Sequence, residues 1–116
     1  MQPRTENVPW AVTPEKVEAA VRKIVEVSRP VRIILFGSYV RSTVGRNSDL
    51  DVLVVSDDTV TDARREAVRI RRALRGILMP MDILVVPLSR WEALKDRPGL
   101  IYREAAKTGV VVYESS

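Results

Sequence analysis

The sequence predicts an α/β (α+β) domain, in which a mixed sheet of about four strands is flanked by helices. Three segments rich in β-branched and other apolar residues read as strands, at residues 31–36, 50–55 and 81–86. Segments with helical spacing of apolar residues lie before, between and after them. The 116 residues, 46% of them hydrophobic, suffice for one domain with a proper core.

The first half of the chain begins with a proline-spaced stretch, residues 1–12, which we expect to be an extended N-terminal arm. The single domain then spans residues 13–116. Thr13-Pro14-Glu15 combines an N-cap hydroxyl, a proline at the first helical position and an acid in the first turn, which predicts a helix ending near Val27. The strand at 31–36 is broken by Gly37-Ser38, and residues 39–48 are expected to form a short helix or loop.

The second half begins with the strand at 50–55 and a turn containing Asp57 and Asp58. A long helix is then expected from Thr61 to about Leu78, with a stripe of apolar residues at helical spacing. This stripe consists of Ala63, Ala67, Ile70, Leu74 and Ile77. Arginines occupy much of the remaining helix surface, which is consistent either with a solvated face or with contact to an acidic partner or nucleic acid.

After the strand at 81–86, the run from Ser89 to Glu92 matches a capping box and predicts a helix start at Ser89. A further helix is expected from about Gly99 to Lys107, capped by Gly109. Residues 110–113 complete the sheet as a short last strand.

The composition restricts the chemistry that the chain can perform. It contains no cysteine and no histidine, which excludes disulfide scaffolds, zinc fingers, thiol nucleophiles and imidazole bases. A bound metal would need oxygen ligands, which favours Mg²⁺, Mn²⁺ or Ca²⁺. The net charge of +4 permits a polyanionic partner but does not demand one. The arginine-rich helix has no interleaved aromatic residues, so we expect no nucleic-acid partner.

Three aspartates occupy positions that a packed sheet disfavours. Asp51 and Asp82 each lie near the start of a predicted strand, and Asp49 lies two residues before Asp51 and hence on the same face. If the two strands are neighbours, all three carboxylates can converge at one end of the sheet. The alternative for these acids is pairing with arginines at strand edges. A carboxylate cluster of this kind would be neutralised by a pair of Mg²⁺ ions.

The turn upstream favours the catalytic interpretation. Gly37 and Ser38 directly follow a strand, where exposed backbone N–H groups and a hydroxyl can bind an anion. Arg41 lies three residues further and could contact phosphate, or form a structural ion pair with an acid such as Asp49. A phosphate-binding turn next to a two-metal carboxylate site is what phosphoryl transfer requires.

Two segments, 35–41 (LFGSYVR) and 47–54 (NSDLDVLV), resemble the signature of the minimal nucleotidyltransferases of the DNA polymerase β-like superfamily. The pattern is Gly-Ser, ten intervening residues, Asp-x-Asp, and a third Asp on a later strand, where Asp82 fits. The resemblance covers residues 15–113. Ser42 departs from it, since many relatives have glycine there.

The resemblance implies a nucleotidyltransferase fold and a site that binds ATP or another NTP. Asp49, Asp51 and Asp82 would be catalytic and would hold two Mg²⁺ ions, with Mn²⁺ as a possible substitute, while Gly37, Ser38 and Arg41 would bind the nucleotide. Minimal members are similar to antitoxins whose partners are helical HEPN toxins. The implied reaction is therefore transfer of AMP to a tyrosine of a HEPN protein, with a homo- or hetero-oligomer among the possible assemblies.

Two alternatives remain open at this point. The chain could transfer a nucleotidyl group to a small molecule such as an aminoglycoside, although about 100 residues of catalytic fold leave no substrate domain. It could instead be a non-catalytic antitoxin that acts by binding alone. No apolar run approaches a membrane span and the N-terminus lacks the apolar core of a secretory signal, so we expect a cytoplasmic protein without membrane contact.

Overall fold

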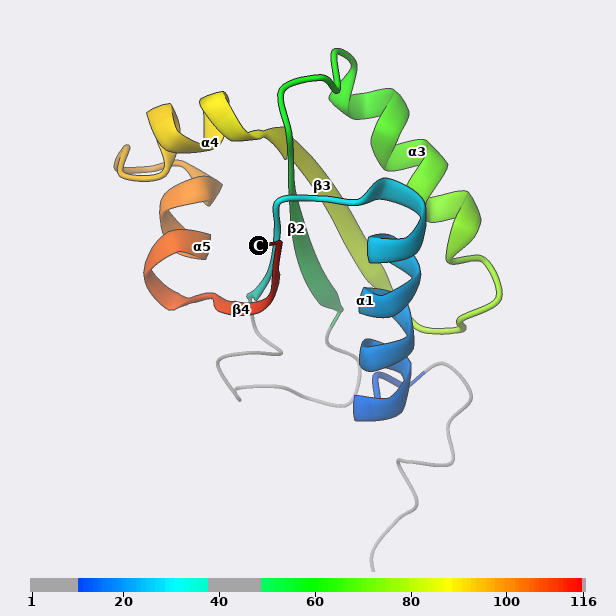
Figure 1. Cartoon of the computed structure of the whole chain (residues 1–116). Coiled ribbons are helices and arrows are strands. Elements are labelled where there is room, and N and C mark those ends of the chain that lie inside the picture. Colours follow the sequence, from blue (N-terminus) through cyan, green and yellow to red (C-terminus); the bar gives the residue numbers. More distant parts are fainter. Residues whose placement is uncertain (1–10, 38–48, 116) are drawn as a thin grey trace, which may run out of the picture.

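The computed structural model describes residues 11–37 and 49–115, which form a four-stranded sheet covered by helices (Figure 1). The elements follow one another as α1 (Pro14–Ser28), β1 (Arg32–Phe36), β2 (Leu50–Ser56), α3 (Ala63–Ala73), β3 (Met81–Pro87), α4 (Leu88–Leu94), α5 (Ile101–Thr108) and β4 (Val110–Glu114). None of the helices in these ranges combines the length and the apolar character needed to cross a membrane. The predicted arm at 1–12 lies almost wholly outside the described residues.

The sheet is mixed, in the order β3-β2-β1-β4. β1 pairs antiparallel with β2 and β4, whereas β2 and β3 run parallel and are connected through α3. The β1–β4 pairing contains an irregularity between Ile33 and Ile34. This arrangement confirms the predicted fold class and makes β3 and β4 the two edge strands.

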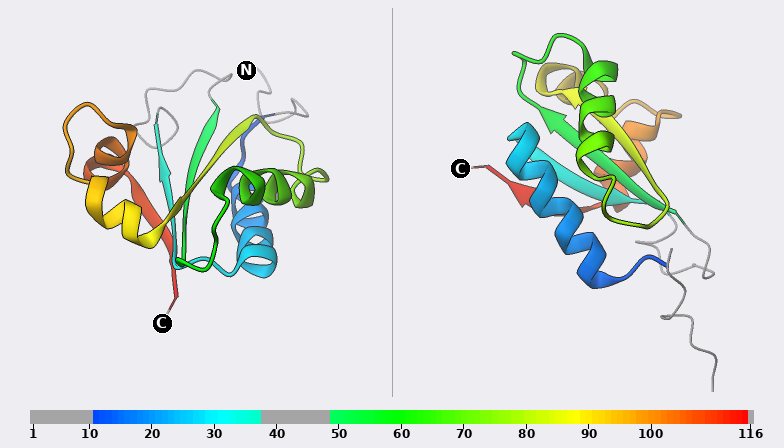
Figure 2. Two further views of the ribbon diagram at one scale, coloured as in Figure 1. Left: turned by 90° about the horizontal axis from the view of Figure 1, so that it is seen from above. Right: turned by 90° about the vertical axis from the view of Figure 1, so that its right-hand side faces the viewer.

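Two apolar layers sandwich the sheet, because alternate residues of each strand face opposite sides. On one side Ile24 of α1 and Ile70 of α3 pack against alternate strand residues such as Val52 and Val54. On the other side Trp91 of α4 and Ala105 of α5 pack against the intervening residues, Leu53 and Val55 among them. Figure 2 shows the two helix pairs on opposite faces of the sheet.

The first helix begins as the sequence predicts. The Thr13 hydroxyl accepts a hydrogen bond from the backbone N–H of Lys16 at 3.2 Å, and Pro14 occupies the first turn. The helix ends at Ser28, and Arg29 adopts the left-handed conformation with φ 48° ahead of Pro30. Proline disfavours helical geometry in the residue before it, which explains a stop at this point.

The arginine-rich helix is shorter than expected. It begins after Asp62, whose carboxylate accepts from the N–H of Arg65 at 3.1 Å, and ends at Ala73 rather than near Leu78. Gly76 lies in the stretch that the prediction included, and glycine is unfavourable inside a helix. Leu74 nevertheless packs in the core and Ile77 packs against it, so the apolar stripe continues through turns instead of helix.

The predicted capping box at Ser89 is wrong. α4 begins at Leu88 after Pro87, without a side-chain cap. The N–H of Ser89 donates instead to Oδ1 of Asp58 at 3.0 Å, in the turn after β2, so an acceptor from a distant loop replaces the local one.

The last helix begins at Ile101, two residues later than expected, and its end at Gly109 agrees with the prediction. The Gly109 N–H donates to the carbonyl of Ala105 at 3.0 Å, but the residue is extended rather than left-handed. A side chain there would overlap the Ala105 carbonyl and Ile34, so the glycine is required by close packing of α5 on β1.

Candidate active site

Two of the three predicted aspartates are neighbours in the sheet. In the parallel register Asp51 of β2 stands opposite Asp82 of β3, and parallel partners project to the same face. This is the face that carries Leu53 and Val55 and that α4 and α5 cover further along the strands. Asp49 lies directly before β2 and is exposed. The sheet thus brings the predicted acids to one end, where β2 and β3 begin.

The turn after β1 lies against one of these carboxylates. Gly37 follows Phe36, and Phe36 is the register partner of Asp51 on the other side of β2. Gly37 has φ +87°, and a Cβ placed on it would overlap Oδ2 of Asp51 and lie 3.0 Å from its Cγ. Only glycine adopts this positive φ without strain and also leaves room for the Asp51 carboxylate. Gly37 thus lies against the Asp-x-Asp motif, whereas Ser38 and Arg41 lie outside the described residues.

The acidic side chains differ in burial. Asp51 is half-buried, while Asp49 and Asp82 are exposed. Across residues 11–37 and 49–115 no three acidic side chains lie close enough together to hold a metal ion. The described part of the chain thus shows a pair of carboxylates with a third acid nearby, and the three-acid ligand set stays a prediction.

The donor chemistry at this end of the sheet is compatible with a divalent cation. Asp51 and Asp82 contribute only carboxylate oxygens, which suit hard ions such as Mg²⁺ and Mn²⁺. Two adjacent carboxylates repel each other, and a cation relieves that repulsion. The family implies a divalent ion in general, and the residues that would hold it are Asp51 and Asp82, together with Asp49.

A large groove lies away from the aspartates. It has a volume of about 970 Å³ and runs between α1 and β4. Its lining is mostly apolar and includes Val17, Val21 and Val25 from α1 and Val112 and Tyr113 from β4. Because none of the predicted site residues lines it, this groove is a surface separate from the aspartates.

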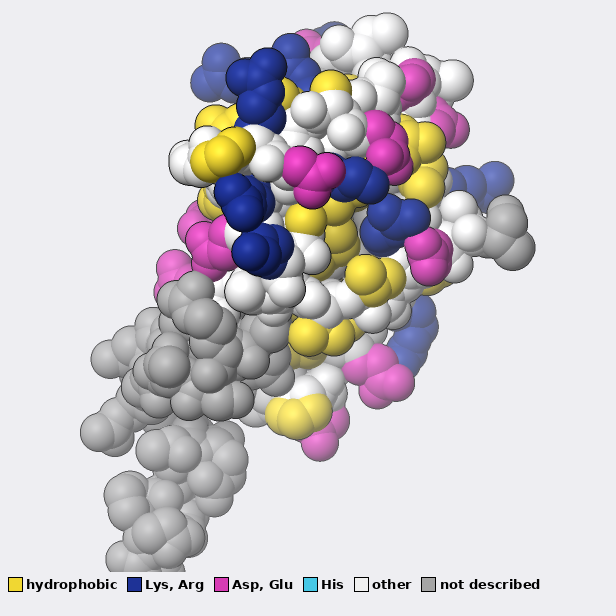
Figure 3. All heavy atoms as spheres, turned by 90° about the vertical axis from the view of Figure 1, so that its left-hand side faces the viewer, with side chains coloured by type: hydrophobic (Ala, Val, Ile, Leu, Met, Phe, Trp, Pro, Cys, Tyr) yellow, Lys and Arg dark blue, Asp and Glu magenta, His cyan; other side chains and the backbone are white. Residues whose placement is uncertain are grey.

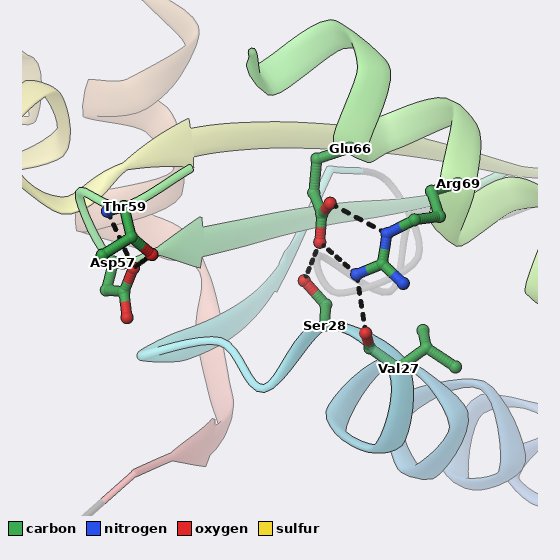
Figure 4. A network of polar contacts seen from close by, with 6 residues as sticks. All are labelled: Val27, Ser28, Asp57, Thr59, Glu66 and Arg69. Carbon is green, nitrogen blue, oxygen red and sulfur yellow. Dashed lines mark hydrogen bonds and ion pairs between the residues drawn. The ribbon is translucent and has the colours of Figure 1, made fainter. Parts of the chain in front are cut away.

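A polar network that the sequence pattern does not predict connects α1 to α3 (Figure 4). Oε2 of Glu66 accepts from the Ser28 hydroxyl at 2.6 Å and from Nη2 of Arg69 at 2.8 Å, and the same Nη2 donates to the carbonyl of Val27 at 2.6 Å. The Arg69 guanidinium, with a smaller contribution from Ser28, lowers the pKa of Glu66 against the opposing effect of burial. The only sequence signal was the i, i+3 spacing of Glu66 and Arg69. The network is structural and lies away from the aspartate pair.

The acids of the turn after β2 have structural roles. The Asp57 carboxylate accepts from the hydroxyl and the N–H of Thr59, and these hydrogen bonds lower the pKa of Asp57 (Figure 4). Asp58 accepts from the N–H of Ser89. Neither acid takes part in the candidate site.

The chain matches one protein family by sequence and resembles solved structures in its fold. A family model described as a nucleotidyltransferase domain matches residues 15–107. A chain from a crystal structure of a toxin–antitoxin with AMP-PNP is 23% identical with a TM-score of 0.54, covering 85% of this chain and 74% of that chain. A proposed nucleotidyltransferase from Sulfolobus solfataricus is 20% identical with a TM-score of 0.56, covering 86% of this chain and 78% of that one.

At these identities the two structures show a shared fold, and no curated protein matches the chain significantly. The family match extends from the second residue of α1 almost to the end of α5, and so includes Gly37 and all three aspartates. The chain therefore belongs to the nucleotidyltransferase domain family.

Proposed function

We propose that this chain transfers a nucleoside monophosphate, AMP from ATP, to a hydroxyl group in a reaction that depends on Mg²⁺. The observation that carries the proposal is the pair formed by Asp51 and Asp82, with the Gly37 turn packed against Asp51. Membership of the nucleotidyltransferase domain family supports this reaction class. The chain needs no imidazole or thiol for it, in agreement with its composition.

In the proposed mechanism, Gly37 and Ser38 present backbone N–H groups and a hydroxyl to the phosphates, and Arg41 adds a cation. Asp49, Asp51 and Asp82 would hold the divalent ion, which supplies positive charge against the phosphate oxygens. The acceptor oxygen forms a bond to the α-phosphorus, the bond to the bridging oxygen breaks, and pyrophosphate leaves. Asp82, which is exposed and is the register partner of Asp51, would take the acceptor's proton.

The acceptor in this proposal is a tyrosine of a HEPN toxin, so that the chain acts as an antitoxin. Two observations support it. The motif of residues 35–54 resembles that of minimal nucleotidyltransferases, and one structural neighbour comes from a toxin–antitoxin with AMP-PNP.

The test is incubation of the purified chain with α-labelled ATP, Mg²⁺ and a co-encoded helical protein. We expect label on a tyrosine of that protein, and loss of labelling in the Asp49→Asn/Asp51→Asn variant. Asp96→Asn is a matched control, because Asp96 is an exposed acid after α4 and outside the site. Absence of label with every NTP would refute the proposal.

Two other outcomes would assign a different function. Labelling of an aminoglycoside, with no label on any protein, would place the acceptor among small molecules. If the Asp49→Asn/Asp51→Asn variant still neutralised the partner in cells, the chain would act by contact alone.

A further inference from the structure

The surface of α3 carries an excess of positive charge that the candidate active site does not use. Five arginines lie within the helix and one follows it, at positions 64, 65, 69, 71, 72 and 75. Of these six arginines, Arg69 alone has an ion pair within the described part of the chain, and its partner is Glu66. On the side of α4 and α5, by contrast, basic side chains stand among acidic and hydrophobic ones (Figure 3). Solvent-exposed like charges that lack counter-charges attract an acidic partner.

A groove lies between this helix and the edge of the sheet. The α3/β3 groove has a volume of about 350 Å³. Its lining residues are Ala63, Arg64, Ala67, Val68, Arg71, Ile83, Leu84 and Val85. Apart from the two arginines all of them are apolar, and Val68 is 47% exposed. The groove therefore combines an apolar lining with two guanidinium groups.

The backbone of β3 forms one wall of the groove and belongs to an edge strand. Such a strand presents unpaired N–H and C=O groups on its outer side, which can pair with an added strand. Nη2 of Arg71 reaches the carbonyl of Ile83 at 3.4 Å, a long contact that an incoming strand could replace. On the outer side of β3, the contact from Arg71 is thus weak enough for an added strand to displace it.

We propose that the α3/β3 groove binds an extended acidic segment of a partner protein. Apolar side chains of the segment would pack on Val68 and the β3 residues, and its carboxylates would pair with Arg64 and Arg71. The apolar lining favours a peptide over a nucleic acid, since the groove offers no aromatic side chain for base stacking.

The groove lies close to the candidate active site. Ile83, in the groove, directly follows Asp82, so a segment paired with β3 would lie next to the candidate active site. The proposal does not depend on catalysis, because a partner that is only bound could use the same groove.

The probe for the test is a fluorescein-labelled peptide of alternating Glu and Val residues, titrated with the full chain and followed by anisotropy. We expect saturable binding that weakens as NaCl is raised, and none for a peptide of alternating Lys and Val. The Arg64→Glu/Arg71→Glu variant should bind at least about tenfold more weakly. Arg90→Glu makes the same kind of charge reversal at an exposed residue of α4 and should bind within about twofold of the unchanged protein.

Thermal unfolding by circular dichroism establishes that each variant folds, and Arg64→Gln/Arg71→Gln provides a milder version if charge reversal prevents folding. The proposal is overturned if the acidic peptide does not bind, or if Arg90→Glu weakens binding as much as the groove variant. It is also overturned if a single-stranded oligonucleotide binds more tightly than the peptide and loses its binding in the groove variant, because the surface would then be a nucleic-acid site.

Discussion

Asp51 of β2 and Asp82 of β3 are direct register partners in the parallel part of the sheet. Like charges at such a position destabilise a sheet, because the side chains project side by side from the same face. Aliphatic residues follow both acids along their strands, and Asp is depleted in strands generally. A cation held between the two carboxylates would relieve their repulsion, which is the role that we propose for the divalent ion.

This relationship predicts opposite effects of Asp82→Asn on stability and on activity. Because the substitution removes one of two adjacent negative charges, we expect a small increase in the free energy of unfolding in EDTA, measured by urea denaturation. Nucleotidyl transfer should fall at least about a hundredfold, since the carboxylate would both hold the ion and accept a proton. A variant that is less stable and fully active would contradict the assignment.

A second prediction concerns Gly37, which has φ +87° and lies against the Asp51 carboxylate. Gly37→Ala should lower the free energy of unfolding by roughly 1–3 kcal/mol through backbone strain. It should also displace Asp51 and abolish nucleotide-dependent thermal stabilisation. Gly76→Ala is the matched control, since a Cβ there meets nothing within 4 Å, and we expect it to leave stability unchanged or slightly higher. Equal effects of the two substitutions on nucleotide binding would refute the role given to Gly37.

Metal and nucleotide should stabilise the folded chain together. At a ligand concentration about 100-fold above Kd, mass action adds about 2.7 kcal/mol to the free energy of unfolding, a shift in Tm of several degrees. We expect this shift with ATP and Mg²⁺, its reversal by EDTA, and its absence in Asp49→Asn/Asp51→Asn. Differential scanning fluorimetry with each NTP measures it and also gives the base preference. Stabilisation that persisted in the double variant would place the nucleotide elsewhere.

The sequence predicts the strands and the position of Asp51 and Asp82 near strand starts, because β-branched runs and misplaced acids are local signals. The sequence does not predict that β2 pairs in parallel with β3, because this pairing depends on where α3 returns the chain to the sheet. Hydrogen bonds between residues far apart in the sequence also cannot be predicted from local patterns. Asp58 replaces the local cap of α4 from 31 residues away. Ser28 and Glu66, 38 residues apart, form a hydrogen bond that no pattern in the sequence indicates.

The Glu66 network makes stability depend on pH. The pKa of Glu66 is lowered, mainly by Arg69, so the folded state binds a proton there less readily than the unfolded chain does. The stabilisation is therefore fully present above the unfolded value of about 4.3 and is lost as the pH falls through the lower folded pKa. Glu66→Gln, which keeps the shape but removes the charge, should cost about 1 kcal/mol near neutral pH.

The measurement is urea denaturation of the unchanged protein and of Glu66→Gln at several pH values between 7 and about 3.5. The difference in free energy of unfolding should stay constant down to about pH 5.5 and then shrink as Glu66 becomes protonated. Glu92→Gln is the control, because its ion pair with Lys95 is half exposed and should contribute little. A difference that did not shrink in acid would mean that Glu66 stabilises the contact between α1 and α3 by hydrogen bonds that the glutamine amide cannot replace, rather than by its charge.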